Sequence, residues 1–437
     1  MKNDLSSAPH GSALSFTGSY TRFLSWTLVV YIISIPFVAA FALAPSLPLP
    51  LLAAILMTFS YLPVARIRFD LFDPLFAILF FLVVIPWLWS SPYITVKALT
   101  HLSALFTVFF VFFFIPRHIL TAQFCIQDGF ERFCRLYALV LFLVSLLLIF
   151  EFIANNVLGF RLNTVIPYPA RQEYQAIITA EILRSRGLAA ESGHMALLFD
   201  LGLFLSVIGV RGHFQRCIFW PVVLFGFVTM FSVASFFLVA VAVVYYVLRL
   251  SLSRPVVALY LVAAVALLAF IGWFFWGGVL EEYFLRSFIP KLSLLWLDAS
   301  VGSAASRLSA FTEAVSLVAS YPFGIGFGIA PAAAELGGFY FGLPISAGHI
   351  SLFNLFLVAG GIPAAMCFLV IHFGFVLRSM KLRRYSRPVS AGGIALSLHS
   401  LLNGDFYLPF LWLFWALVVA LHASERRRCG VLRRSTC

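Results

Sequence analysis

Apolar residues occur in long runs along almost the whole chain, and short polar segments separate these runs. Several runs exceed the roughly 18–20 residues that a helix needs to cross the hydrocarbon core of a bilayer. Apolar and polar residues do not alternate within them, as they would in the strands of a transmembrane barrel. The pattern therefore predicts an all-α fold, a polytopic bundle of about twelve transmembrane helices with a helical region outside the membrane.

The predicted spans belong to a single integral membrane domain that covers residues 1–437. Gly360, Gly361 and Pro363 interrupt the tenth span and predict a break in that helix. The polar N-terminal segment lacks the features of a signal peptide, so we expect the first run to be a permanent helix. The spans cover residues 24–43, 47–64, 71–89, 98–115, 136–158, 193–210, 217–231, 234–249, 255–277, 350–379, 389–403 and 407–423.

Lysine and arginine residues are unevenly divided between the two sides of this bundle. With the N-terminus in the cytoplasm, eight of the 29 basic residues fall outside and the other 21 fall inside. This bias follows the positive-inside rule and predicts that both termini are cytoplasmic. The net charge of +12 mostly reflects the same bias and favours membrane lipids, not nucleic acid, as partners. The outer eight are Lys97, Arg161, Arg171, Arg184, Arg186, Arg286, Lys291 and Arg307.

The amino-acid composition narrows the class of protein further. Hydrophobic residues make up 62% of the chain and charged residues only 11%, which fits no soluble domain. All six cysteines fall in predicted membrane or cytoplasmic segments, so we expect no disulfide framework. No Cys/His spacing typical of a zinc site occurs either.

Two outer segments are long, about 159–192 and about 278–349, and loops of that length are often functional. The first ends in RSRGLAAESGH, which places Arg184, Arg186 and Glu191 just before an apolar run. Ionisable groups close to a bilayer are candidates for function. Others that map near the outer ends of spans are His101, His194, His399, Glu151 and Asp405.

The second loop contains SAASRLSAFTEAVSLVASYPFGIGFG, which predicts a helix that Ser303 or Ser306 caps and Pro322 ends. Arg307 lies in its first turn. The glycines that follow let the backbone turn tightly, approach a ligand closely and give the loop flexibility. GIGFG follows a helix instead of a strand, so it is no dinucleotide fingerprint. The predicted apolar face is Leu308, Phe311, Val315 and Val318, and the glycines are Gly324, Gly326 and Gly328.

Three stretches together resemble the O-antigen ligase/polymerase superfamily. RSRGLAAESGHMALLFDL is similar to its Arg-Gly…Glu stretch before a span, and SRLSAFTEAVSLVASYPFGIGFG to its Arg-bearing periplasmic helix with Pro-x-Gly-x-Gly. GHISLFNLFLVAGGIPA is similar to its His-led helix with a Gly pair, and His349 is that histidine. The chain departs from the family at Ile350, where Asn is common, and at Ala359, where Glu is common.

The resemblance implies a glycosyltransferase at the periplasmic face of the bacterial inner membrane, without metal or other cofactor. The donor would be an oligosaccharide on undecaprenyl diphosphate, and other polysaccharide assembly proteins would be partners. Residues 159–192 and 278–349 would then be the first and the large periplasmic loops. A polymerase transfers the glycan to the next lipid-linked repeat unit, whereas a ligase transfers it to lipid A–core. RGLAAES favours the polymerase form.

The residues suit this chemistry, because a leaving diphosphate gains negative charge that arginine can hold in a fork. Arg186 and Arg307 are the expected diphosphate clamp, with Arg184 as a third cation. His349 or Glu191 would accept the proton of the incoming hydroxyl. In the simpler alternative, Arg184 binds lipid phosphate and Glu191 caps the next helix. The outer segments contain no Asp-x-Asp for a metal ion.

A transporter of the same lipid-linked glycan is the alternative from another class. Transporters of this kind often contain an internal repeat and paired broken helices, and we find no convincing repeat. Asp200 and His372 are the only deep ionisable groups that the sequence offers for transport.

Overall fold

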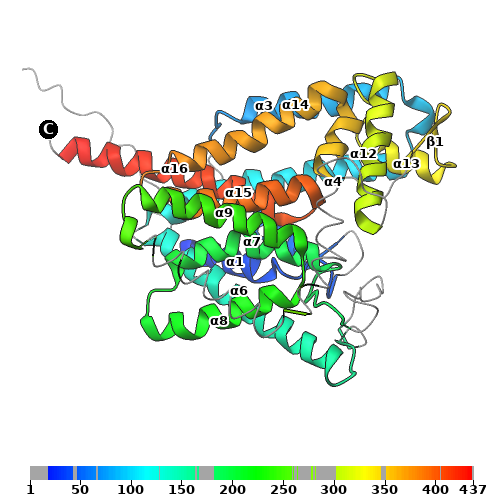
Figure 1. Ribbon diagram of the computed structural model, residues 1–437. Helices are drawn as coiled ribbons and strands as arrows, with labels where there is room; N and C mark the ends of the chain where they lie inside the picture. Colours follow the sequence, from blue (N-terminus) through cyan, green and yellow to red (C-terminus); the bar gives the residue numbers. More distant parts are fainter. Residues whose placement is uncertain are drawn as a thin grey trace, which may run out of the picture.

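The computed structural model describes residues 18–42, 47–64, 67–126, 128–162, 165–166, 182–257, 302–345, 351–403 and 405–435, together with residues 259, 263, 277, 278 and 281. Helices dominate the described chain (Figure 1). Its one sheet is a hairpin of β1 (Phe339–Tyr340) and β2 (Leu343–Pro344). The helices are α1 (Gly18–Ser34), α2 (Leu49–Tyr61), α3 (Asp73–Val84), α4 (Val96–Val108), α5 (Ile115–Cys125), α6 (Gly129–Asn156), α7 (Ser192–Gly209), α8 (His213–Thr229), α9 (Val233–Ser251), α12 (Gly302–Ser320), α13 (Ile329–Glu335), α14 (Leu352–Met380), α15 (Ser386–Asn403) and α16 (Pro409–Ser435).

The all-α prediction is confirmed, and a helix overlaps each predicted span except 255–277, most of which lies outside the described residues. Within the described chain, five helices are long and apolar enough to cross a bilayer, which indicates a membrane protein. The count of twelve spans stays a prediction. The five are Val96–Cys125, Gly129–Asn156, Ser192–Gly209, Val233–Ser251 and Leu352–Met380.

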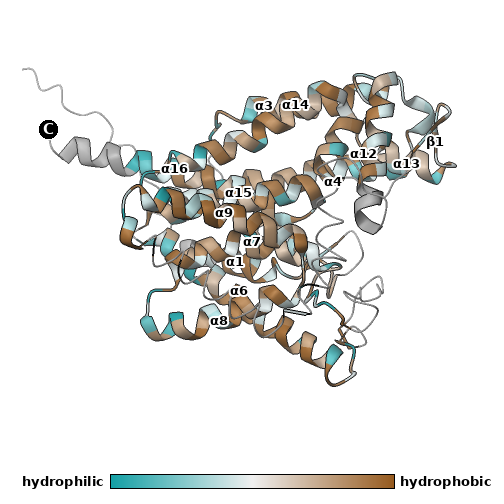
Figure 2. Cartoon of the chain, in the orientation of Figure 1, coloured by the Kyte–Doolittle hydropathy of each residue, from teal (hydrophilic) through white to brown (hydrophobic). Residues whose placement is uncertain are grey.

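An exposed apolar stripe on α9 also suits contact with lipid. Its members recur at intervals of three and four residues, so they share one helix face. They are Phe237, Val241, Val244 and Leu248. Figure 2 shows apolar residues along the helices and hydrophilic residues mostly near their ends.

The fourth predicted span, 98–115, is longer than expected. A π-helical segment, Phe109–Phe114, joins α4 to α5, so that one helix of 30 residues runs from Val96 to Cys125. Arg117, which we assigned to a cytoplasmic segment, is therefore buried on a helix. Its guanidinium donates to both carboxylate oxygens of Asp73, at 2.5 and 2.9 Å. Hydropathy alone could not reveal this partner, because it lies on another helix.

The predicted break in the tenth span is confirmed at Gly360 and Gly361, whose backbone angles are not helical. A break leaves carbonyl groups of the helix without their usual donors, and Pro363 has no N–H to offer Ala359. The segment Pro322–Gly326 supplies the missing partners. Ile325 donates to Val358 O (2.9 Å), Gly326 donates to Ala359 O (2.8 Å), and Ile362 donates to Pro322 O (3.2 Å).

The bundle has two chemically different ends. At the left of Figure 1 lies the C-terminal end of α16 with its run of arginines, and the turn between α14 and α15, which carries Arg383 and Arg384, contacts α16 there; we call this the basic end. At the right lie α12, α13, β1 and the segment that precedes α7; we call this the loop end. The separation agrees with the predicted charge bias, whereas the compartment that each end faces stays a prediction.

Candidate functional site

The segment 182–191 is fixed to the loop end by hydrogen bonds to α6 and α8. The amide of Asn156 donates to Leu183 O at 2.8 Å and accepts from Leu183 N–H at 2.7 Å. Ser185 donates through its backbone to Thr229 O (3.0 Å) and through its hydroxyl to Leu148 O (2.9 Å). These bonds place the RSRG stretch in a defined position between the C-terminal ends of α6 and α8.

Glu151 of α6 holds the turn that contains Arg186. Its carboxylate is fully buried and accepts the backbone N–H groups of Arg186 (3.0 Å) and Gly187 (2.7 Å). Gly187 has φ +61°, and a Cβ there would lie 3.2 Å from the Leu148 side chain. The sequence placed Glu151 near an outer helix end but did not show that it shapes the arginine turn. A lone glutamate in the apolar run of α6 was the available signal.

The two arginines of this segment differ in burial. Arg186 is 4% exposed, and its Nη1 donates to Ala190 O at 3.4 Å. Arg184 is half-buried. The position of Arg186 is therefore set by its backbone and its surroundings, as a fixed cation requires.

Glu191 stands at the N-cap position of α7 with an extended backbone, φ −131° and ψ 152°. The expectation that Glu191 caps this helix is thus met in position, but its side chain makes no capping hydrogen bond and can act on α7 only through its charge. Its carboxylate is near enough to Tyr407 to act on that hydroxyl electrostatically. Glu191 thus faces the connection between α15 and α16.

That connection adds a second acid to the site. Tyr407 donates its hydroxyl to Asp405 Oδ2 at 2.7 Å, and His194 Nε2 lies 3.3 Å from the same oxygen. His194 and Asp405 were each expected near an outer helix end. Their contact was not expected, because the two residues are 211 positions apart in sequence (405 − 194). The structure therefore brings Glu191, His194 and Asp405 into one polar cluster at the loop end.

The other two predicted site residues, Arg307 and His349, lie partly or wholly outside the described residues. The backbone of α12 carries Arg307 at the loop end, but the side chain of Arg307 lies outside the described residues. His349 also lies outside them. The clamp of Arg186 with Arg307, and the role of His349 as a base, accordingly stay predictions.

The apolar face predicted for α12 is wrong in part, since Val315 is 47% exposed. The buried face instead contains Ala310, Ala314 and Leu317. Small alanines let α12 approach α14 closely, and the bulkier valine is left on the outer surface. Hydrophobicity alone could not show which apolar positions on this helix face the bundle.

Gly324, Gly326 and Gly328 have φ of +78°, +103° and +83°, and their segment is buried. A Cβ on Gly324 would lie 2.5 Å from the backbone nitrogen of Gly361. The three glycines therefore allow turns and close packing of backbone in a fixed segment, where the sequence suggested a flexible loop.

Tryptophan and serine side chains from the segment after α3 lock the same turn. Trp87 Nε1 donates to Phe327 O at 3.1 Å, and Trp89 Nε1 donates to Gly324 O at 3.1 Å. Ser90 donates its hydroxyl to Ile325 O at 2.5 Å. The second long loop is thus anchored to the bundle at its glycine segment.

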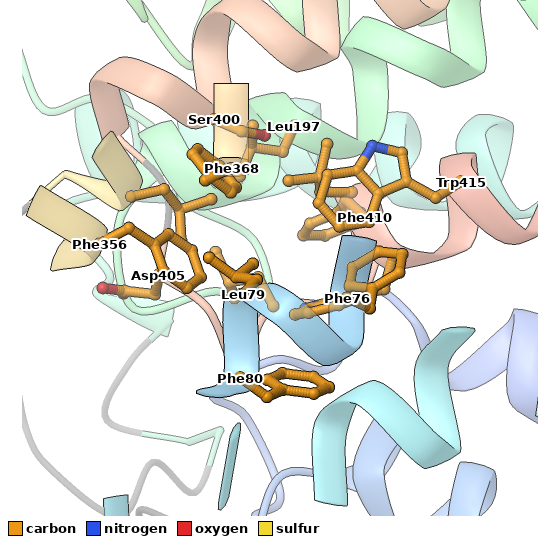
Figure 3. A pocket seen from close by; sticks show the side chains of 14 residues that line it. Phe76, Leu79, Phe80, Leu197, Phe356, Phe368, Ser400, Asp405, Phe410 and Trp415 are labelled. Carbon is orange, nitrogen blue, oxygen red and sulfur yellow. The ribbon is translucent and has the colours of Figure 1, made fainter. Parts of the chain in front are cut away.

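An aromatic-lined pocket lies beside the polar cluster, among α3, α7, α14, α15 and α16 (Figure 3). Its polar lining residues are Ser400 and Asp405. Asp405 belongs to both the pocket and the polar cluster, so the two features are continuous. The aromatic lining residues are Phe76, Phe80, Phe356, Phe368, Phe410, Trp412 and Trp415.

Within the described ranges, no three His, Cys, Asp or Glu residues come together in a way that could hold a metal ion. The sequence matches no protein-family model and no curated protein. The family resemblance therefore rests on the three quoted stretches, and function must be argued from the site.

Proposed function

We propose that the protein is a membrane glycosyltransferase that takes a glycan from a polyprenyl diphosphate at its loop end. The observation that carries the proposal is Arg186, a buried guanidinium on a turn that Glu151 holds, where apolar helices end. A lipid-linked diphosphate would present its negative charge at this depth. Arginine stays charged and binds phosphate oxygens in a fork.

In this proposal, cleavage of the sugar–phosphate bond leaves its electron pair on the diphosphate. A fixed cation at a low-dielectric boundary stabilises that charge better than mobile water does. Arg186 holds the diphosphate, Arg307 on α12 is the second member of the clamp, and Arg184 is the third cation. The clamp supplies the charge that a metal ion supplies elsewhere.

The incoming hydroxyl loses its proton to Glu191 or His349 in the proposed reaction. Glu191 is supported by its place in the polar cluster with Asp405 and His194, next to the arginine turn. An acid cluster beside a buried cation allows one group to bind phosphate while another accepts a proton.

The finer assignment is a polysaccharide polymerase of the bacterial inner membrane, with an O-antigen ligase as the near alternative. A transporter of the lipid-linked glycan is the second candidate, and the buried contact of Asp200 with His399 favours it. Ionisable pairs inside a bundle are typical of transport and proton pathways.

Deletion of the gene, followed by analysis of the lipid-linked glycans, tests the proposal. Accumulated single repeat units at the outer face would support a polymerase, and long lipid-linked chains not joined to lipid A would support a ligase. Repeat units retained at the cytoplasmic face would contradict a glycosyltransferase and support the transporter. Complementation with wild-type protein is the control.

A further inference from the structure

A carboxylate and an imidazole meet in the interior of the helix bundle. Asp200 on α7 and His399 on α15 are both fully buried, and Nδ1 of the histidine lies 2.5 Å from Oδ2 of the aspartate. Ser235 on α9 donates its hydroxyl to the other carboxylate oxygen at 2.6 Å. Asp200 comes eight residues after the start of α7, so it lies about 12 Å along the helix from the loop end.

The other titratable groups around the pair come from α6 and α14. Tyr137 of α6 interacts electrostatically with Asp200. His372 of α14 contacts Ser397 O at 3.0 Å, two residues from His399 on the same helix. The pair thus has polar neighbours on several packed helices, in a region that is otherwise aliphatic and aromatic.

Three polar atoms on α14 and α15, one of them on the pair itself, are buried without a hydrogen-bond partner among the described residues. They are Nε2 of His399, Nδ1 of His372 and Oγ of Ser397. A buried polar atom without a partner costs about 1–3 kcal/mol, so a fold retains such atoms together only at a cost to stability. This favours a site that binds something over a set of purely structural hydrogen bonds.

The aromatic-lined pocket borders both the polar cluster of the loop end and residues close in sequence to the pair. Ser400 lines the pocket and follows His399 directly, and Leu197 lines it about one helical turn from Asp200 (Figure 3). Asp405 lines the same pocket and contacts His194 in the polar cluster. The pocket that borders the polar cluster therefore also borders α15 at the residue next to His399.

We propose that Asp200 and His399 form a proton-binding site inside the bundle, which the loop end reaches through the pocket lined by Ser400 and Asp405. The pair shares one proton when the imidazole donates Nδ1–H to the carboxylate, and a second proton can reside on the carboxylate or on Nε2. The proposal does not depend on glycan transfer.

The alternative interpretation is that the contact is only a structural hydrogen bond between α7 and α15, and it predicts a different result. Its carboxylate would keep one protonation state at every pH at which the protein is folded. The two interpretations therefore differ in whether Asp200 takes up a proton, which can be measured without any assay of enzyme activity.

Dicyclohexylcarbodiimide is the probe, since it adds to a protonated carboxyl in an apolar environment and yields a stable N-acylurea. Full-length protein in lipid nanodiscs is treated at pH 5 to 8, and the adduct is located by mass spectrometry. We expect Asp200 to be modified, at a rate that falls as the pH rises and approaches about a tenfold decrease per pH unit, as for a single carboxyl. Asp73, which pairs with Arg117, is the matched buried acid and should stay unmodified.

Two variants sharpen the test. His399→Gln removes the imidazole that contacts the carboxylate, so the pH range in which Asp200 is modified should change. Ser400→Trp fills the pocket and should lower the modification rate; Leu197→Phe serves if that variant does not fold. An unmodified Asp200 at all pH values, or a yield independent of pH, would overturn the proton-binding site. A wild-type rate in the pocket variants would overturn the route.

Discussion

The basic end and the loop end use the same kinds of charged residue in different ways. At the basic end, acids meet arginines side chain to side chain: Asp70 with Arg378 at 2.5 and 2.8 Å, and Asp73 with Arg117. At the loop end, Glu151 instead binds two backbone N–H groups of the arginine turn.

Paired charges at the basic end neutralise each other and join neighbouring elements. Glu131 extends this arrangement, because it contacts both Arg211 and Arg384. A carboxylate that binds backbone groups determines the shape of a turn and so fixes where Arg186 lies. The comparison therefore contrasts ion pairs that join helices at the basic end with backbone hydrogen bonds that shape the arginine turn at the loop end.

The largest expected effect concerns which end faces the outside, because the comparison depends on it. A cysteine at Glu335, on α13, should react with an impermeant maleimide in intact cells. A cysteine at Arg384, at the basic end, should react only after the cells are opened. Reaction of the Arg384 position in intact cells would reverse the two ends and remove the basis for the site.

Breaking the buried pair at the basic end should cost the most stability. Asp73→Ala leaves Arg117 buried without its counter-charge, and we expect a loss of about 3–5 kcal/mol in the free energy of unfolding. Thermal unfolding in detergent measures it. Asp73→Leu with Arg117→Met should recover most of the loss, whereas no recovery would show that the charges themselves are needed.

Arg186→Lys tests the chemistry of the loop end. Lysine keeps the charge but loses the fork, so polymer formation should fall by about 10²–10³-fold, equivalent to about 2–4 kcal/mol. Polymer is measured at matched protein level. Arg161→Lys, at an exposed position near the end of α6, is the control and should change little. Normal polymer from Arg186→Lys would exclude a geometric clamp.

Glu151→Ala and Glu151→Gln separate the shape of the turn from its charge. Alanine leaves two buried N–H groups without an acceptor, and we expect a loss of about 2–3 kcal/mol of stability together with lower activity. Glutamine still offers a carbonyl oxygen as an acceptor, so the Glu151→Gln variant should lose less stability and less activity than Glu151→Ala. Equal loss in the two variants would mean that the negative charge of Glu151 matters more than its hydrogen bonds.

The smallest expected effect is the pH dependence of the Asp70–Arg378 pair. Burial alone would raise the pKa of Asp70, but the hydrogen bonds and charge of Arg378 lower it below its ordinary value. The pair therefore stabilises the fold above a pH of about 4, and its contribution is lost as the pH falls further. The stability difference between wild type and Asp70→Asn should be constant from pH 5 to 7 and shrink below pH 4. A difference that grows with acid would contradict this assignment.

Local pattern was sufficient to predict the helix ranges and the break at Gly360 and Gly361, since both depend on residues close in sequence. It also selected the segment with Arg186 and Glu191, because charges stand out in an apolar chain. It could not predict that Arg117 is buried, or that Asp200 meets His399, since each partner lies on another helix. The exposed side of α12 was missed for a related reason, because which apolar residues of a helix are buried depends on the helices that pack against it.

The way in which the glycine segment completes the broken helix α14 also bears on the order of assembly. Ile325 and Gly326 form their backbone hydrogen bonds with Val358 and Ala359, which are synthesised later. Residues 322–328 therefore leave the ribosome before their partners exist, and they reach their final conformation only after α14 has been made. This part of the loop end is therefore completed late in biogenesis.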